Sequence, residues 1–301
     1  MEKAYFPHFI IGGAAKSGTT SLSRYLDQLP GLFIPEREPN FFTYLDQKSP
    51  YDIKNHEFIS GFHSYFSLMK PHEPQEDVIL GEKSVSYLYK DYYQQVIGNI
   101  KKNHPFWEKL KWIFILRNPT ERAYSQYIHN LNFHEELSFK DAIEQWPERK
   151  AAGWIPAYDY LGAGFYSESI QAYLKHFEQV RIYLFDDLME RPLWLMSDIM
   201  KFLNIEASPK NISFAKYNSS GIPRNKLLKI GLPLLSTFYP LHSVINRIIP
   251  SRVRLKIRKF THQKPLLPAS HKKELYSYYS AEIKQLETII KRDLSDWNYG
   301  E

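Results

Sequence analysis

The sequence contains no cysteine, and this absence excludes several kinds of chemistry at once. A chain without thiols has no disulfide, no thiolate nucleophile and no cysteine-bound zinc. The sequence also lacks an uninterrupted apolar run of about 20 residues, which a membrane-spanning helix would need. No basic segment followed by an apolar one precedes the first expected strand, so no secretory signal is recognised. We therefore expect a cytoplasmic protein.

Acidic residues are missing from a long interval near the C-terminus. None occurs between Glu206 and Glu274, where the sequence has 14 lysines and arginines. A local positive field of this kind attracts an anionic ligand, polymer or membrane surface, although a solvated basic face is the plain alternative. Because residues 207–268 are also rich in proline and serine, we expect a basic lid or excursion there, on a single domain that spans residues 1–301.

Short apolar segments alternate with helical patterns along the chain. Strands are expected at Phe9–Ile11, Leu32–Ile34, Asp77–Glu82, Leu110–Leu116 and Val180–Phe185. Helices are expected at about Tyr89–Lys102, Pro119–Leu131, Ser138–Lys150, 167–179, Met189–Leu203 and Ser270–Leu294. Such an alternation predicts an α/β fold of three layers, in which helices flank a central parallel sheet.

The first expected strand leads into a loop of small residues and then into a helix, all within His8–Leu22. A loop of this kind at the start of a helix is a cradle for a phosphate group. Gly13 and Gly18 have the spacing of the P-loop, but Thr19 stands where its lysine belongs, and Lys16 is the only lysine of the loop. The pattern suggests a ligand that is bound through its 5′-phosphate and whose reacting group is not a γ-phosphoryl group. An ordinary glycine-rich turn is the alternative.

Three expected strands end at charged residues that could take part in binding or catalysis: the Lys16 loop, Glu82 and Arg117. Ligands of parallel sheets bind beyond the carboxyl ends of the strands, so these groups would share one crevice if their strands are neighbours. Arg117 and Ser125 could then face one phosphate through a planar guanidinium and a hydroxyl. Taken singly, each residue has a plainer explanation. Glu82 could be a solvated carboxylate or an ion-pair partner of Lys83, and capping a helix could be the whole role of Arg117.

These motifs resemble those of sulfotransferases that use 3′-phosphoadenosine 5′-phosphosulfate, and the carbohydrate, heparan-sulfate-type branch is the most similar. The resemblance rests on Phe9–Leu22, Glu82–Ser84 and Leu116–Ser125, and the layout of Arg37–Phe42, Gly162–Tyr166 and Lys264–Trp297 also fits. The family usually has lysine where Arg37 stands and often histidine where Asn40 stands, so this chain departs from the pattern at both positions.

The resemblance implies a role for each matched residue. The 5′-phosphosulfate would be bound by Lys16, Ser17, Gly18, Thr19 and Thr20. The 3′-phosphate would be bound by Arg117 and Ser125, Lys264 is a further candidate nucleotide ligand, and Glu82 matches the family's catalytic base. Sulfuryl transfer needs positioning, a cation near the bridging oxygen and a base for the acceptor proton, but no metal. Lys16 would supply the cation and Glu82 the base, with His129 or His134 as the alternative base.

The implied acceptor is a hydroxyl or amine, most simply of a sugar or glycan, and no nucleic-acid partner is expected. A P-loop kinase is the first alternative, but Thr19 replaces its lysine and Arg117 stands where a strand-end aspartate would bind magnesium. A non-catalytic binder of acidic glycans or membranes is the second. Leu227–Ile249, followed by a basic segment, could lie on an anionic membrane, but prolines interrupt any long helix there, so membrane contact is not favoured.

Overall fold

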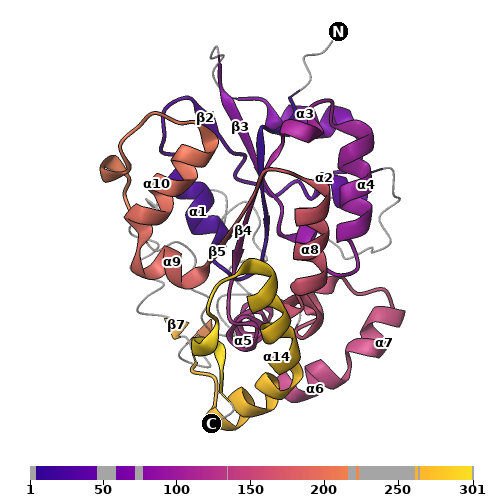
Figure 1. Ribbon diagram of the computed structural model, residues 1–301. Coiled ribbons are helices and arrows are strands. Elements are labelled where there is room, and N and C mark those ends of the chain that lie inside the picture. Colours follow the sequence, from indigo (N-terminus) through magenta and orange to yellow (C-terminus); the bar gives the residue numbers. More distant parts are fainter. Residues whose placement is uncertain are drawn as a thin grey trace.

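A five-stranded parallel sheet forms the centre of the molecule (Figure 1). The computed structural model describes residues 5–45, 59–71, 77–133, 135–215, 222–223, 262–263 and 265–299. The strands are β1 (Phe9–Gly13), β2 (Leu32–Phe33), β3 (Ile79–Lys83), β4 (Lys111–Leu116) and β5 (Val180–Leu184). Their order in the sheet is β2-β3-β1-β4-β5, and every pairing is parallel.

Strand β1 lies between β3, which carries Glu82, and β4, which is followed by Arg117. Its residue Ile11 is in register with Lys83 of β3 on one side and with Ile113 of β4 on the other. All of β1 is buried, as expected for a central strand covered on both faces. The three strands are therefore neighbours, which is the condition for their polar ends to lie together, and their carboxyl ends meet at one edge of the sheet.

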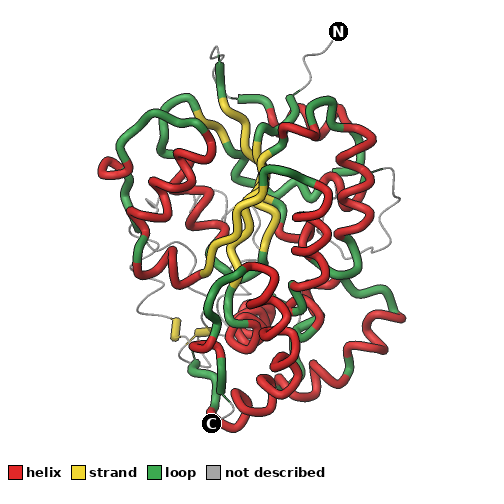
Figure 2. The backbone as a smooth tube through the Cα atoms, in the orientation of Figure 1, coloured by secondary structure: helices red, strands yellow, loops and turns green. Residues whose placement is uncertain are grey.

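Helices cover both faces of the sheet and also its carboxyl edge (Figures 1 and 2). One face is covered by α1 (Thr19–Leu26), α9 (Phe185–Glu190) and α10 (Pro192–Leu203). The other carries α2 (Phe41–Tyr44), α3 (Phe62–Met69), α4 (Tyr93–Asn103) and α8 (Ser167–His176). Beyond the carboxyl ends of the strands lie α5 (Pro119–Asn130), α6 (Phe139–Glu144), α7 (Trp146–Ala151) and α14 (Ala269–Ile290). The expected three-layer α/β fold is confirmed.

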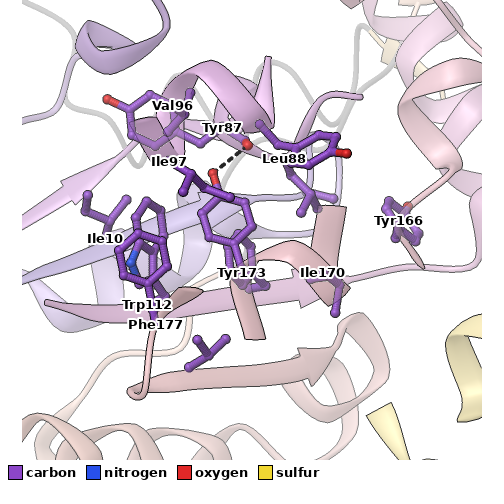
Figure 3. Close-up of a cluster of buried hydrophobic side chains, with 14 of the residues drawn as sticks. Ile10, Tyr87, Leu88, Val96, Ile97, Trp112, Tyr166, Ile170, Tyr173 and Phe177 are labelled. Atoms are coloured by element: carbon purple, nitrogen blue, oxygen red, sulfur yellow. Dashed lines mark hydrogen bonds between the residues drawn. The ribbon is translucent and has the colours of Figure 1, made fainter. Parts of the chain in front are cut away.

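Aromatic side chains join the second helical layer to the sheet (Figure 3). Trp112 of β4 is completely buried and packs with its ring centroid 4.6 Å from that of Tyr173 on α8. The Tyr173 hydroxyl donates a 2.8 Å hydrogen bond to the carbonyl oxygen of Tyr87, in the short 3-10 helix η1 (Val85–Leu88) that follows β3. This contact anchors the turn at the end of β3, where the site begins.

Two helices that the sequence pattern predicted as continuous are each divided in two. The expected helix Ser138–Lys150 is α6 and α7, and the expected helix Met189–Leu203 is the end of α9 followed by α10. In both cases a proline, Pro147 or Pro192, lies in the first turn of the second helix. Proline has no N–H to donate to the preceding turn, so it begins a helix but does not continue one.

The expected basic lid lies mostly outside the described residues. Within it, β6 (Ile222–Pro223) and β7 (His262–Gln263) form a short antiparallel pair. Among the described helices, none is both long and apolar enough to cross a membrane.

Candidate functional site

The loop that carries Lys16, here called the Lys16 loop, leaves β1 at Gly13 and ends where α1 begins at Thr19. The N–H of Ala14 donates to the carbonyl oxygen of Ile115 at 2.8 Å, which fixes the loop to β4. Gly18 has a φ of +89°, and a Cβ at this position would lie 2.5 Å from a methyl carbon of Leu188. Glycine is therefore required there by both backbone and packing. The first N–H groups of α1 lack partners within the helix and favour an anion.

Buried polar atoms without a hydrogen-bond partner gather at this edge of the sheet. Among the described residues they include Ser17 Oγ in the loop, Arg117 Nε after β4 and Thr120 Oγ1 at the start of α5. Buried polar atoms are almost always bonded, because an unpaired one loses its water without compensation. A ligand with several acceptor oxygens, such as a phosphorylated nucleotide, would supply the missing partners.

Arg117 lies against the Lys16 loop. Its Nη1 donates to the carbonyl oxygen of Lys16 at 3.3 Å, and its guanidinium carbon lies 4.7 Å from the ring centre of Phe185. Its Nη2 donates to Glu121 of α5 at 2.7 Å. Ser125 is buried one turn beyond Glu121 on the same face of α5. The structure thus brings Arg117 to the Lys16 loop, as the sequence predicted.

Glu82, at the end of β3, has no exposed surface. Its Oε1 accepts hydrogen bonds from Ser84 Oγ at 2.7 Å and Tyr87 Oη at 2.5 Å, and its Oε2 accepts one from Tyr65 Oη at 2.6 Å. Burial raises the pKa of this carboxyl above its usual range, although the three hydroxyls act in the opposite direction. The expected alternative of a Glu82–Lys83 ion pair is wrong, because Lys83 pairs with another carboxylate.

That carboxylate is Glu38, which the sequence interpretation did not single out. Its Oε1 lies 3.2 Å from Lys83 Nζ, and its Oε2 accepts the N–H of Val85 at 3.3 Å. The Glu38 side chain is 27% exposed, whereas Lys83 is buried. Glu38 belongs to the Arg37–Phe42 segment, and the only signal for it was the similarity of that segment to the family pattern.

Four further candidates are either exposed or partly exposed, or lie outside the described residues. His129, on α5, is half-buried, with its ring centre 5.0 Å from that of the exposed Phe133. Arg37 is exposed. Lys264 and His134 are outside the described residues, so their expected roles stay predictions.

Curated proteins similar to this chain are much longer than it is. The human protein named bifunctional heparan sulfate N-deacetylase/N-sulfotransferase 3 is 26% identical over 207 residues, which cover 66% of this chain and 22% of that protein. The Xenopus tropicalis protein named bifunctional heparan sulfate N-deacetylase/N-sulfotransferase 1 is 27% identical over 206 residues, with the same two coverages. The match therefore spans about a fifth of each relative.

A solved structure and a family model match a larger share of the chain. The crystal structure of a sulfotransferase from Alicyclobacillus acidocaldarius is similar over 97% of this chain and 98% of its own, with a TM-score of 0.69 and 26% identity. The family model described as the sulfotransferase domain matches residues 6–223. These findings confirm the resemblance and the enzyme class that the sequence motifs indicated. The chain belongs to the sulfotransferase family.

Proposed function

We propose that this protein transfers a sulfuryl group from 3′-phosphoadenosine 5′-phosphosulfate to a hydroxyl or amine of a carbohydrate. The observation that carries the proposal is the contact between Arg117 and the Lys16 loop. It places a buried guanidinium, with an Nε that lacks a partner among the described residues, beside a helix N-terminus. One phosphorylated nucleotide could bind to both the helix N-terminus and the guanidinium, with its 5′-phosphosulfate on the loop and its 3′-phosphate at Arg117.

The reaction needs three groups from the protein. A new bond forms between the acceptor oxygen or nitrogen and sulfur, the bond from sulfur to the 5′-phosphate oxygen breaks, and the acceptor proton passes to a base. The products are the sulfated acceptor and adenosine 3′,5′-bisphosphate. Lys16 would stabilise the negative charge on the departing phosphate oxygen, the loop and Arg117 would hold the nucleotide, and a carboxylate would take the proton.

Two carboxylates are candidates for the base: Glu82 in β3, and Glu38, which contacts the end of that strand. The sequence prediction assigns this role to Glu82, but its oxygens are buried and already accept three hydroxyl hydrogen bonds. A general base must come within hydrogen-bond distance of the acceptor. Glu38 is partly exposed at the same edge of the sheet, where buried Lys83 fixes its position. We therefore favour Glu38 as the base and assign Glu82 a supporting role.

The carbohydrate acceptor is supported by the names of the similar proteins, which describe heparan sulfate sulfotransferases. The acid-free interval between Glu206 and Glu274 agrees with an acidic glycan, because its lysines and arginines would attract a polyanion. Mass spectrometry of products from a panel of acceptors with labelled donor tests this part of the proposal. Products confined to non-carbohydrate phenols or amines would contradict it.

Calorimetry with adenosine 3′,5′-bisphosphate, compared with ATP and magnesium, tests the donor. We expect submicromolar binding of the bisphosphate that does not depend on magnesium. A preference for ATP with magnesium would instead support the P-loop kinase that the glycine spacing left open. Absence of nucleotide binding would favour a non-catalytic binder of acidic glycans.

The base is tested by kcat and its pH dependence in Glu38→Gln and Glu82→Gln. We expect Glu38→Gln to lower kcat by about 10²–10⁴-fold, the usual loss for a general base, and to remove the acidic limb of the kcat/KM profile. Bisphosphate affinity should change little, because the change leaves the Lys16 loop intact. The same loss in Glu82→Gln, with Glu38→Gln near the wild type, would return the role to Glu82.

A further inference from the structure

The start of α2 is capped by two hydroxyls from a distant part of the chain. Asn40, the N-cap residue, has a φ of 47°, and its side chain makes no cap to the helix. Its N–H donates to Ser84 Oγ at 2.9 Å, and the N–H of Phe42 donates to Tyr87 Oη at 3.1 Å. The first N–H groups of a helix have no partner within it, so these two hydroxyls satisfy amides that would otherwise be unpaired.

Both hydroxyls are themselves bound to Glu82 Oε1. A hydroxyl has one proton to donate, and an ionised carboxylate can only accept. The protons of Ser84 and Tyr87 must therefore point at Glu82, which leaves their lone pairs for the amides of Asn40 and Phe42. The buried carboxylate sets the direction of both hydrogen-bond chains.

The same segment carries Glu38. Two residues before Asn40, Glu38 bonds Lys83 and the N–H of Val85, which flank Ser84 in the sequence. A further bond runs from Ser86 Oγ to Asn40 Oδ1 at 2.7 Å. The segment from Glu38 to Phe42 is thus tied to the end of β3 at several successive positions, and two of these ties depend on Glu82.

We propose that Glu82 is a positioning residue, which acts through Ser84 and Tyr87 to hold the segment that carries Glu38 at the carboxyl edge of the sheet. The effect on catalysis rests on the function proposed above, whereas the effect on the segment does not. Glutamine at position 82 can preserve this arrangement, because its amide oxygen can accept both hydroxyls while its NH₂ group donates to Tyr65. An apolar residue of similar size cannot.

Hydrogen exchange at the amides of Asn40 and Phe42 measures the positioning directly. We expect Glu82→Gln to retain their protection and Glu82→Leu to lower it by about tenfold or more, as expected for the loss of a hydrogen bond. Tyr87→Phe should expose the Phe42 amide alone. Tyr65→Phe is the matched control for exchange, because it removes a hydroxyl from the same carboxylate but none from an amide. Unchanged protection in both Glu82→Leu and Tyr87→Phe would overturn the proposal.

Turnover gives a second readout that separates positioning from direct participation. We expect kcat of Glu82→Gln to stay within a few-fold of the wild type with its acidic limb intact, while Tyr87→Phe lowers kcat without changing bisphosphate affinity. Tyr183→Phe, which removes a buried hydroxyl bound to Asp198 on the other face of the sheet, controls for a general loss of packing. A large kcat loss with a missing acidic limb in Glu82→Gln would overturn the proposal. If the protein transfers no sulfuryl group, the exchange result still decides the positioning.

Discussion

Arg117, just before α5, donates a 2.7 Å hydrogen bond to Glu121 in the first turn of that helix, at the place where the 3′-phosphate is proposed to bind. The Arg117 side chain is buried, whereas Glu121 is partly exposed and also accepts a 3.3 Å hydrogen bond from Tyr299 Oη. The Glu121 carboxylate therefore neutralises part of the positive charge of Arg117, with which the 3′-phosphate would interact. The Nε of Arg117 has no hydrogen-bond partner among the residues described, so a bound phosphate could still accept from it.

Replacement of Arg117 by alanine should weaken the binding of adenosine 3′,5′-bisphosphate by about 2–3 kcal/mol, because a charge-assisted hydrogen bond to the 3′-phosphate is lost. Adenosine 5′-phosphosulfate lacks that phosphate and should lose little affinity. Calorimetry with both ligands measures the difference. Equal losses would mean that Arg117 only supports the loop through its bond to Lys16.

Glu121→Gln should strengthen bisphosphate binding by about three- to tenfold, because the 3′-phosphate would no longer meet a nearby negative charge. The gain should shrink as salt screens the exposed part of the site. Glu144→Gln is the matched control, since Glu144 also pairs with a cation one helical turn away but lies in α6. Weaker binding in Glu121→Gln would show instead that Glu121 orients Arg117.

The arrangement of the strands could be predicted from the sequence because it follows from local patterns. Apolar runs identify buried strands, and parallel strands present their carboxyl ends at one edge, so Lys16, Glu82 and Arg117 were correctly placed there. The division of two expected helices could have been predicted as well, since Pro147 and Pro192 mark the breaks.

The surroundings of the two carboxylates could not be predicted in this way. Tyr65 and Tyr87 reach Glu82 from separate segments, and Glu38 comes from a stretch of irregular structure that returns over the end of β3. Such contacts depend on tertiary packing and leave no period in the sequence. This explains why Glu82 was readily identified as a strand-end carboxylate while its burial was not foreseen.

The acid-free interval leads to a prediction about the acceptor. If it recruits a polyanionic glycan, reversal of charge at Arg252, Arg254 and Arg258 should raise the acceptor KM, and less so as salt rises, because exposed charges are screened beyond about 10 Å at 0.1 M. These residues lie outside the described part of the chain, so the prediction rests on their sequence alone. Lost nucleotide affinity with an unchanged KM would assign them to the donor site, and no change in either would leave a solvated basic face.

An ion pair with a buried carboxylate joins the C-terminal part of the chain to α9 and should make stability depend on pH. Asp187, only 1% exposed, accepts hydrogen bonds from Arg292 at 2.8 and 3.1 Å, from Arg191 at 2.5 Å and from the N–H of Leu184 at 2.9 Å. Burial alone would raise the pKa of this carboxyl, but the bonds from Arg292, Leu184 and Arg191 outweigh it and hold the pKa below its usual range.

Because the pKa of Asp187 is lower in the folded chain, its stabilising effect is complete above the unfolded value of about 3.9 and is lost as the pH falls through the folded value. Asp187→Asn should therefore lower the free energy of unfolding by about 1.5–3 kcal/mol at pH 7, since it removes the charge-assisted hydrogen bonds from Arg292 and Arg191, whose partly exposed guanidinium groups water can still solvate. The gap between wild type and variant, measured by urea unfolding, should narrow below about pH 4. Asp91→Asn, which breaks the more exposed pair with Lys150, should cost less than about 1 kcal/mol. If the stability difference between wild type and Asp187→Asn stays constant down to pH 3, the lost stability would come from the hydrogen bond between the Leu184 N–H and Asp187. That bond joins the carboxyl to an uncharged group, so its contribution does not depend on an ion pair.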